Sequence, residues 1–335
     1  MLDLAEIKQL SVGLDEHLRR LESFTPLLRE IKSSLDEILH AQETNYLLEL
    51  GKLRREVENV NEELGKRGLP LSSEYELKLQ SLKEMLNSED WPQALDSEQI
   101  CFGNTEKKVE RANNILDLFI GEHLKDKKFL DYGCGSGEVV FEASKREAKA
   151  FGYDIDPDQF HPHELLSSDF EEIRKHAPFD VILVHDVLDH IEHIDPLQAL
   201  LQIKELLSPQ GKVYVRNHPW SSRHGGHLYN TENKAFMHLI FDEMELTRIG
   251  GYSCDHNICV MDPIGTYRHW FSETGFDVKE EFPICSKVEK FFTDPSPVFE
   301  KLKSYWPDSD CITNILEIDF VEYILESKDQ EMNII

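Results

Sequence analysis

The strongest constraint on the fold is an alternation of strand-like and helix-like segments that starts at Lys127. Short apolar segments typical of strands cover residues 128–132, 150–155, 179–185, 211–216, 275–282 and 316–325. Helical periodicity covers residues 137–146, 196–207 and 263–274. The segment FDVILVH (179–185) is almost continuously apolar, as expected for a strand covered on both faces. This order predicts an α/β fold with a mostly parallel sheet and helices on both faces.

The turn after the first strand carries the clearest signal of a ligand site. Residues 129–138 read FLDYGCGSGE, an apolar strand followed by glycines at every second position. Glycine lets the backbone approach a ligand where a Cβ would clash, and the following helix start presents free N–H groups. The spacing G-x-G-x-G differs from the G-x-G-x-x-G of dinucleotide sites. The pocket therefore need not hold a pyrophosphate.

An acid at the end of the second strand completes the pattern. Asp154 lies 19 residues after Gly135. An ionised carboxylate there can accept hydrogen bonds from both hydroxyls of a ribose. A glycine-rich turn alone, or an acid after a strand alone, is a common structural feature. Their joint occurrence at this spacing, inside a strand–helix–strand unit, predicts a nucleoside site.

With these motifs, residues 127–282 resemble the class I S-adenosylmethionine-dependent methyltransferases. The stretch VLDHI (187–191) after the fourth strand is similar to the small-molecule and glycan members. The resemblance covers roughly half of the chain. It implies a Rossmann-like, seven-stranded, mostly parallel sheet and S-adenosyl-L-methionine as the cofactor.

The resemblance also implies roles for residues along the carboxyl edge of the sheet. The loop at residues 131–135 would contact the methionine part, Asp154 the ribose, and Ile155 the adenine ring. Asp169 and Phe170 would lie at the adenine edge, although the chain before them leaves room for only a very short helix and strand. His185, followed by Asp186, would line the methyl-donor end. The implied cofactor residues are Asp131, Gly133, Cys134, Gly135, Asp154, Ile155, Asp169, Phe170 and His185.

The segment after the fifth strand predicts the acceptor side of the site. Residues 216–229 contain three histidines, two arginines, a tryptophan and a tyrosine. A general base assists when the methyl acceptor is a hydroxyl, because its proton must leave. We therefore expect the base to be His218, His224 or His227, although a surface loop with incidental histidines is the alternative. His190, just past the fourth strand, is another option for the base. The isoleucines after it suggest a helix start, so a structural role is an equal alternative.

Two metal sites were weighed, and no metal is expected. Asp186 and Asn217 resemble positions used by divalent-metal O-methyltransferases, but two oxygen ligands are too few for Mg²⁺. The spacing of Cys254, His256 and Cys259 does not match common zinc motifs.

A helical arm is expected before the core. An apolar stripe at steps of three and four residues runs through residues 1–64 and is too narrow to bury itself alone. It fits an intramolecular hairpin or, as we slightly favour, a coiled coil that makes a homo-oligomer. The expected domains are the arm at 1–90, a linker with a leading helix at about 106–124 within 91–126, and the methyltransferase domain at 127–335. An insertion for the substrate covers about 219–262, with one helix over residues 233–248.

Composition narrows the partners. The chain has 36 basic and 64 acidic residues, a net charge of -28, which disfavours nucleic acid because phosphate backbones are repelled. No apolar run reaches the ~20 residues of a membrane span, and the N-terminus does not resemble a signal peptide. Six cysteines are too few for a disulfide scaffold, so a cytoplasmic setting is expected.

These observations favour O-methylation of a small polar acceptor, such as a sugar or a related metabolite. A nucleic-acid methyltransferase is the alternative enzyme, but the fourth strand is not followed by the [DNS]PP[YFW] motif of base-amine methyltransferases. The alternative outside enzymes is a non-catalytic, cofactor-binding assembly protein. The sequence leaves open the acceptor, the methylated atom, the identity of the base and the number of subunits.

Overall fold

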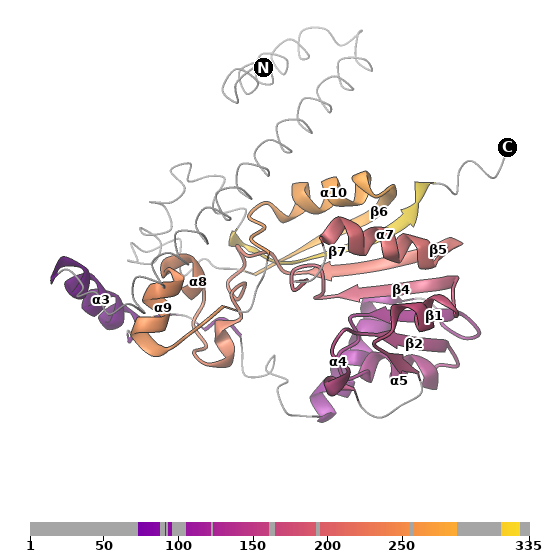
Figure 1. The fold of residues 1–335 in the computed structure, drawn as a ribbon, viewed down its shortest axis with the longest axis horizontal. Helices are drawn as coiled ribbons and strands as arrows, with labels where there is room; N and C mark the ends of the chain where they lie inside the picture. The colour runs from indigo at the N-terminus through magenta and orange to yellow at the C-terminus, as the bar shows by residue number, and fades with distance from the viewer. Residues whose placement is uncertain are drawn as a thin grey trace, which may run out of the picture.

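A central sheet organises the protein in the computed structural model (Figure 1). The structure describes residues 73–87, 91, 93–95, 105–121, 123–160, 165–191, 195–254, 258–286 and 316–328. The helical arm predicted for residues 1–64 lies outside this part of the chain. The sheet has seven strands in the order β3-β2-β1-β4-β5-β7-β6.

The sheet is mostly parallel, as predicted. Its strands are β1 (Lys128–Tyr132), β2 (Lys149–Tyr153), β3 (Leu166–Ser167), β4 (Phe179–His185), β5 (Leu207–Asn217), β6 (Phe276–Cys285) and β7 (Ile318–Ser327). Four neighbouring pairs are parallel, whereas β7 runs antiparallel to both β5 and β6. The carboxyl ends of β1 to β5 therefore meet at one edge of the sheet.

Helices cover both faces of the sheet. They are α4 (Thr105–Asn114), the π-helical η1 (Ile115–Ile120), α5 (Glu138–Lys145), α6 (Phe170–Arg174), α7 (Pro196–Leu206) and α10 (Pro263–Glu273). Alternate residues of β4 serve the two cores: Ile182 packs with the α7 and α10 side, and Leu183 packs with the α5 and η1 side. Both side chains are fully buried. Burial on both faces explains the continuous apolar run of this strand.

Two predicted helices differ in the structure. The helix expected to reach residue 124 ends at Ile120, because Gly121 adopts a left-handed conformation with φ 61°. The single helix expected over residues 233–248 is wrong. Two helices, α8 (Met237–Ile240) and α9 (Glu243–Gly250), take its place. Asp242 between them has extended backbone and makes a capping box with Glu245, which starts a new helix there.

A small second core joins the N-terminal side of the described chain to the insertion. Helix α3 (Ser73–Leu86) lies beside α9, and both lie with α8 to one side of the sheet (Figure 1). The indole N–H of Trp91 donates to the carbonyl of Ala235 at 2.8 Å, and Asn233 bonds the backbone of Leu95. These contacts attach α3 and Trp91 to the insertion. Among the described helices, none has the length and apolar character needed to cross a membrane.

Candidate functional site

The glycine loop lies between β1 and α5 and bonds to the end of β2. The backbone N–H groups of Gly133 and Cys134 donate to the carbonyl oxygen of Tyr153 at 2.7 and 3.0 Å. A Cβ on Gly133 would lie 2.3 Å from a methyl of Val187, so the close approach of two loops requires glycine there. Gly135 has φ +50°, and the nearest atom to an added Cβ would be 3.9 Å away. Gly135 therefore faces open space, where a ligand can approach the main chain.

Asp154 is bonded to this loop, as its predicted role requires. Its Oδ2 accepts from the N–H of Gly135 at 2.8 Å, and its Oδ1 accepts from the N–H of Asp156 at 3.1 Å. A carboxylate has about four lone-pair positions, so it keeps capacity for two ribose hydroxyls. The next residue, Ile155, is 55% exposed, an apolar side chain at the position expected to pack on an adenine ring. These residues fit an adenosine group.

The predicted adenine edge lies after β3, the neighbour of β2. Asp169 is exposed and caps α6 by accepting from the N–H of Glu171 at 2.9 Å. Phe170 is half-buried and meets the ring of Tyr153 edge-on at 5.7 Å. The chain before them holds one short 3-10 helix (Pro157–Gln159) and the two-residue β3, as the limited spacing indicated. The adenine role of Asp169 stays a prediction.

Asp131 near the end of β1 is nearly inaccessible, with 3% of its surface exposed. Burial raises the pKa of its carboxyl to about 7; Arg111 opposes this rise, while Asp154 and Glu138 add to it. A cationic group bound beside this carboxyl would favour its ionised form. The ammonium of the methionine part of the cofactor is such a group, which fits the role that the resemblance implies.

Arg111, which the sequence analysis did not identify as a site residue, contacts the predicted methyl-donor end of the site. Arg111 of α4 contacts Asp186 Oδ2 at 3.0 Å and His185 Nδ1 at 3.2 Å. Burial lowers the pKa of His185 to about 4. Burial opposes ionisation of Asp186, but His185 and Arg216 hold its pKa well below the usual value. Arg111 precedes the glycine motif, and its charge on a surface helix gave no sign of this contact.

Four side chains converge at the ends of β4 and β5, which are parallel neighbours. We name Asp189, His190, His218 and His227 the four-residue cluster. One ligand atom from each lies within 4.8 Å of the others. His218 Nε2 is 3.0 Å from Asp189 Oδ2 and 2.5 Å from His227 Nε2. Asp189 is fully buried, His218 and His227 are nearly so, and the side chain of His190 is 33% exposed.

His224 lies beside the cluster, so all three histidines expected at the acceptor side are together. Its ring centroid is 5.2 Å from that of His218 and 5.0 Å from that of Phe320. Burial, with the nearby Arg223, lowers the pKa of His224 to about 3. We name His218, His224 and His227 the acceptor histidines.

Two further residues of this region lie at the acceptor side. His190, for which the sequence left a base or a structural role open, stacks on His227 with ring centroids 4.5 Å apart, and helix α7 begins at Pro196. Asp189 received no role, although both residues lie in the VLDHI stretch. The signal that could have found them is an acid and a histidine a few residues after a buried parallel strand.

The structure does not support the oxygen-ligand metal site considered from the sequence, and it does not test the cysteine and histidine site. Asn217 Oδ1 accepts from the N–H of Leu188 at 3.2 Å, and Asp186 is paired with Arg111, so both oxygen ligands have protein partners. His256 lies outside the described residues, so the set with Cys254 and Cys259 stays untested.

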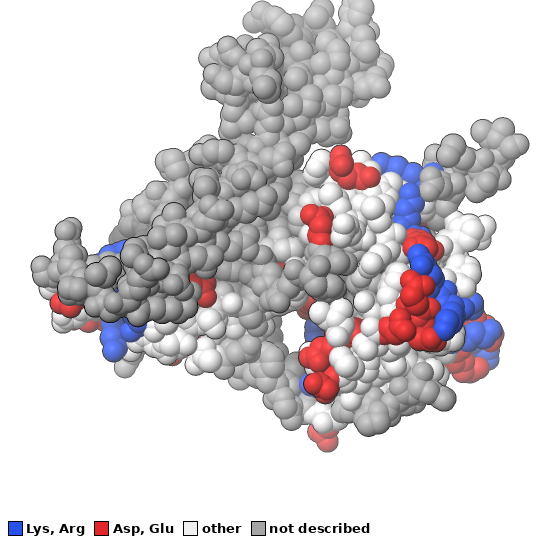
Figure 2. Space-filling model, viewed as in Figure 1, with Lys and Arg blue, Asp and Glu red and all other residues white. Residues whose placement is uncertain are grey.

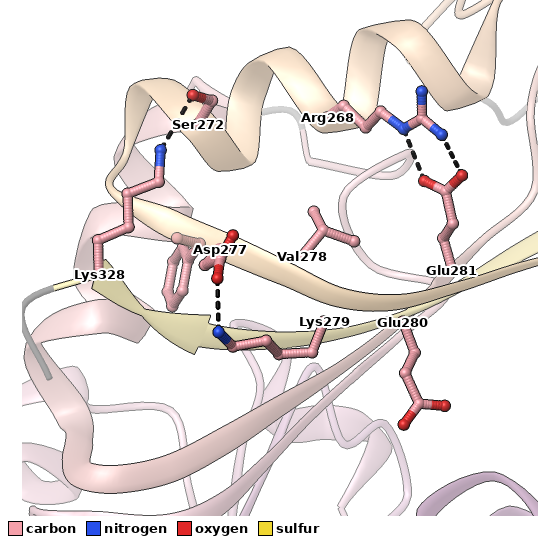
Figure 3. Close-up of a pocket in the computed structure, with 9 residues that line it drawn as sticks. Arg268, Ser272, Asp277, Val278, Lys279, Glu280, Glu281 and Lys328 are labelled. Atoms are coloured by element: carbon pink, nitrogen blue, oxygen red, sulfur yellow. Dashed lines mark hydrogen bonds and ion pairs between the residues drawn. The ribbon is translucent and has the colours of Figure 1, made fainter. Parts of the chain in front are cut away.

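A hollow elsewhere on the surface is not a candidate for the cofactor. It lies between α10 and the edge strand β6, and Figure 3 shows most of its charged side chains bonded to neighbouring side chains. Arg268 bonds Glu281, Lys279 bonds Asp277 at 2.6 Å, and Lys328 bonds Ser272 at 3.2 Å. Strand β6 lies four positions from β1 in the sheet order, far from the glycine loop. On the described surface visible in Figure 2, acidic and basic side chains are intermixed.

Comparison with known proteins identifies the family. Residues 105–281, more than half of the chain, match the family model described as "Methyltransferase domain". A curated relative, the ubiquinone biosynthesis O-methyltransferase of Nitrosococcus oceani, is 28% identical over 123 residues, 32% of this chain. The chain spans 51% of the length of that relative.

Two solved structures illustrate the structural likeness. A SAM-dependent methyltransferase from Archaeoglobus fulgidus is 19% identical with a TM-score of 0.42, covering 65% of this chain and 94% of that one. PKMT2 from Rickettsia typhi, in complex with AdoHcy, is 13% identical with a TM-score of 0.38, covering 65% and 53%.

The family match spans the glycine loop, Asp154 and the acceptor histidines. S-adenosylmethionine is the cofactor of this chain, and the residues at the carboxyl edge of β1 and β2 fit it. The match, together with the predicted sheet and motifs, gives the assignment: the chain belongs to the methyltransferase domain family.

Proposed function

We propose that this protein transfers the methyl group of S-adenosylmethionine to a hydroxyl of a small polar acceptor, such as a sugar or a related metabolite. The observation that carries the proposal is the buried group of acceptor histidines at the end of β5, next to His185 at the end of β4. The name of the Nitrosococcus oceani relative, an O-methyltransferase, supports transfer to oxygen.

The chemistry requires alignment and proton removal. S-adenosylmethionine supplies a methyl group on a positively charged sulfur. The acceptor oxygen forms a bond to the methyl carbon, the carbon–sulfur bond breaks, and its electron pair stays on sulfur. The protein holds both molecules in line and takes the hydroxyl proton. In this proposal one of the acceptor histidines takes that proton, since an imidazole is the most common general base.

The surroundings of these histidines support a polar organic acceptor. Arg216 lies over the ring of Phe320 at 3.8 Å and is 3.7 Å from Glu322. Arg223 is 3.2 Å from Asp319. Hydrogen-bonding groups next to an aromatic ring suit a hydroxylated molecule, whose polar edges and apolar faces both need partners. The overall charge of -28 disfavours a nucleic-acid acceptor.

The test is a methylation assay with the full chain and labelled S-adenosylmethionine. The acceptors are a panel of sugars, nucleotide sugars, catechols and other hydroxylated metabolites, with RNA and amine acceptors as the opposing set. We expect methyl transfer to a hydroxylated small molecule, with S-adenosylhomocysteine formed in equal amount. Transfer to RNA or to an amine only, or cofactor binding with no transfer to any acceptor in either set, would contradict the proposal.

A further inference from the structure

We infer that the four-residue cluster of Asp189, His190, His218 and His227 binds one divalent transition-metal ion. The inference deepens the proposed function and rests on it for the role of the ion, but not for the binding. Three imidazoles and one carboxylate form a donor set that suits zinc and the neighbouring first-row metals. Magnesium is disfavoured, because it prefers oxygen ligands.

The distances support a single shared ion. Zinc binds histidine nitrogen at about 2.0–2.1 Å, so tetrahedral ligand atoms lie roughly 3.3 Å apart. Three of the separations between ligand atoms bracket that value: 2.5 Å for His227–His218, 3.0 Å for His218–Asp189 and 3.7 Å for His190–Asp189. Small side-chain rotations would bring all four atoms around one centre.

The electrostatics also favour a cation at this place. His218 Nε2 and His227 Nε2 lie 2.5 Å apart, and only one of two such nitrogens can carry a proton between them. The ring of His227 is stacked on that of His190 at 4.5 Å and is tilted against that of His218 at 4.3 Å. Three protonated imidazoles at this spacing would repel one another, whereas a shared ion binds their neutral forms.

The backbone holds the cluster in place from two elements. Asp189 and His190 follow β4, and His218 follows β5 directly. His227 adopts a left-handed conformation with φ 53°, which is uncommon for a residue other than glycine and is retained at functional sites. The side chain of His190 is 33% exposed, so the cluster has one open side toward solvent.

The open side gives the ion a role in the proposed reaction. A divalent ion that contacts the acceptor would orient its hydroxyl and lower the pKa of that hydroxyl. His224 lies outside the ligand set. This proposal departs from the expectation, drawn from the sequence, that no metal takes part.

The test measures metal content and ligand fields rather than turnover. The full chain is treated with a chelator, dialysed, loaded with zinc and analysed by elemental mass spectrometry, and cobalt(II) is added in parallel for absorption spectroscopy. We expect about one zinc per chain and an intense visible cobalt spectrum typical of tetrahedral nitrogen and oxygen ligation. Wild-type protein that retains no zinc after dialysis would overturn the proposal, whatever the variants do.

Variants locate the site. Asp189→Ala and His218→Ala should each weaken zinc binding by at least about tenfold. The matched control is His224→Ala, a buried neighbour outside the ligand set, which should retain the zinc. A second control, Cys254→Ser, tests the cysteine set considered from the sequence. Loss of zinc in Cys254→Ser, or full zinc binding in folded Asp189→Ala and His218→Ala, would contradict the assignment; circular dichroism reports the folding of each variant.

The methylation assay and the zinc analysis together separate the two proposals. If protein that binds no zinc transfers methyl to a hydroxyl, the proposed metal site is wrong and the proposed function stands. If the cluster binds zinc but the chain transfers no methyl group to any hydroxyl, the metal site stands and the proposed function is wrong.

Discussion

The cofactor edge and the acceptor side of this protein are built in different ways. The cofactor edge at β1 and β2 comes from one compact stretch of sequence, in which Gly135 and Asp154 are 19 residues apart and bonded to each other. The acceptor side joins the ends of β4 and β5, the insertion and β7. Its contacts include Asp189 with His218 and His224 with Phe320. A site within one strand–helix–strand unit is visible as a motif, whereas a site assembled from separate segments becomes visible only when the sheet is folded.

The largest expected effect is a loss of turnover, at the acceptor side, without a loss of affinity at the cofactor edge. We expect His218→Ala to reduce turnover by about 10²–10⁴-fold, because it removes one of the acceptor histidines on which the proposed reaction depends. S-adenosylmethionine affinity should stay within a few-fold of wild type, since His218 is at the acceptor side. Turnover is measured by S-adenosylhomocysteine release and affinity by calorimetry. An equal loss of affinity and turnover would show that the two regions do not act separately.

A smaller effect tests the electrostatics of the cofactor edge. Burial raises the pKa of Asp131 from 3.8 to about 7, so ionising this carboxyl destabilises the cofactor-free fold as pH rises between these values. Asp131→Asn removes that cost. Relative to wild type, the variant should gain on the order of 4 kcal/mol in free energy of unfolding at pH 8, and little at pH 4.

Urea unfolding of the cofactor-free protein at both pH values measures this gain. The same variant should bind S-adenosylmethionine more weakly at pH 8, because the partner of the methionine ammonium is lost. A stability difference that is equal at pH 4 and pH 8 would refute the buried, proton-binding state of Asp131.

The smallest effect concerns the adenine contact. Ile155→Ser should weaken S-adenosylmethionine binding by roughly three- to thirtyfold. The side chain of Ile155 is 55% exposed, and the variant loses the apolar contact that this side chain would make with the adenine ring. Leu201→Ser is the matched control, since Leu201 on α7 is 53% exposed and far from the glycine loop in sequence. Cofactor titrations of both variants are compared. If the Ile155→Ser and Leu201→Ser variants bind S-adenosylmethionine with equal affinity, Ile155 does not contact the cofactor.

The same contrast explains what could be predicted. Strands such as β4 follow from local apolar patterns, and the role of Asp154 follows from its spacing to the glycines. The contact between Trp91 and Ala235 spans 144 residues, so no local pattern indicates it. The start of α9 at Asp242 was missed, because helical periodicity runs through the capping box that separates α8 from α9. Asp189 was missed because His218, 3.0 Å away, follows another strand and is 29 residues later in the sequence.

The most direct test of the central claim is a calorimetric titration of S-adenosylmethionine into the full chain, wild type and Asp154→Ala. Asp158→Ala, in the exposed turn that follows, is the matched control. We predict about one site per chain for wild type and control, and affinity lower by roughly 10²-fold in Asp154→Ala, since two hydrogen bonds to a charged acceptor are lost. Unchanged affinity in a folded Asp154→Ala variant would contradict the assignment of the cofactor to the edge of β1 and β2.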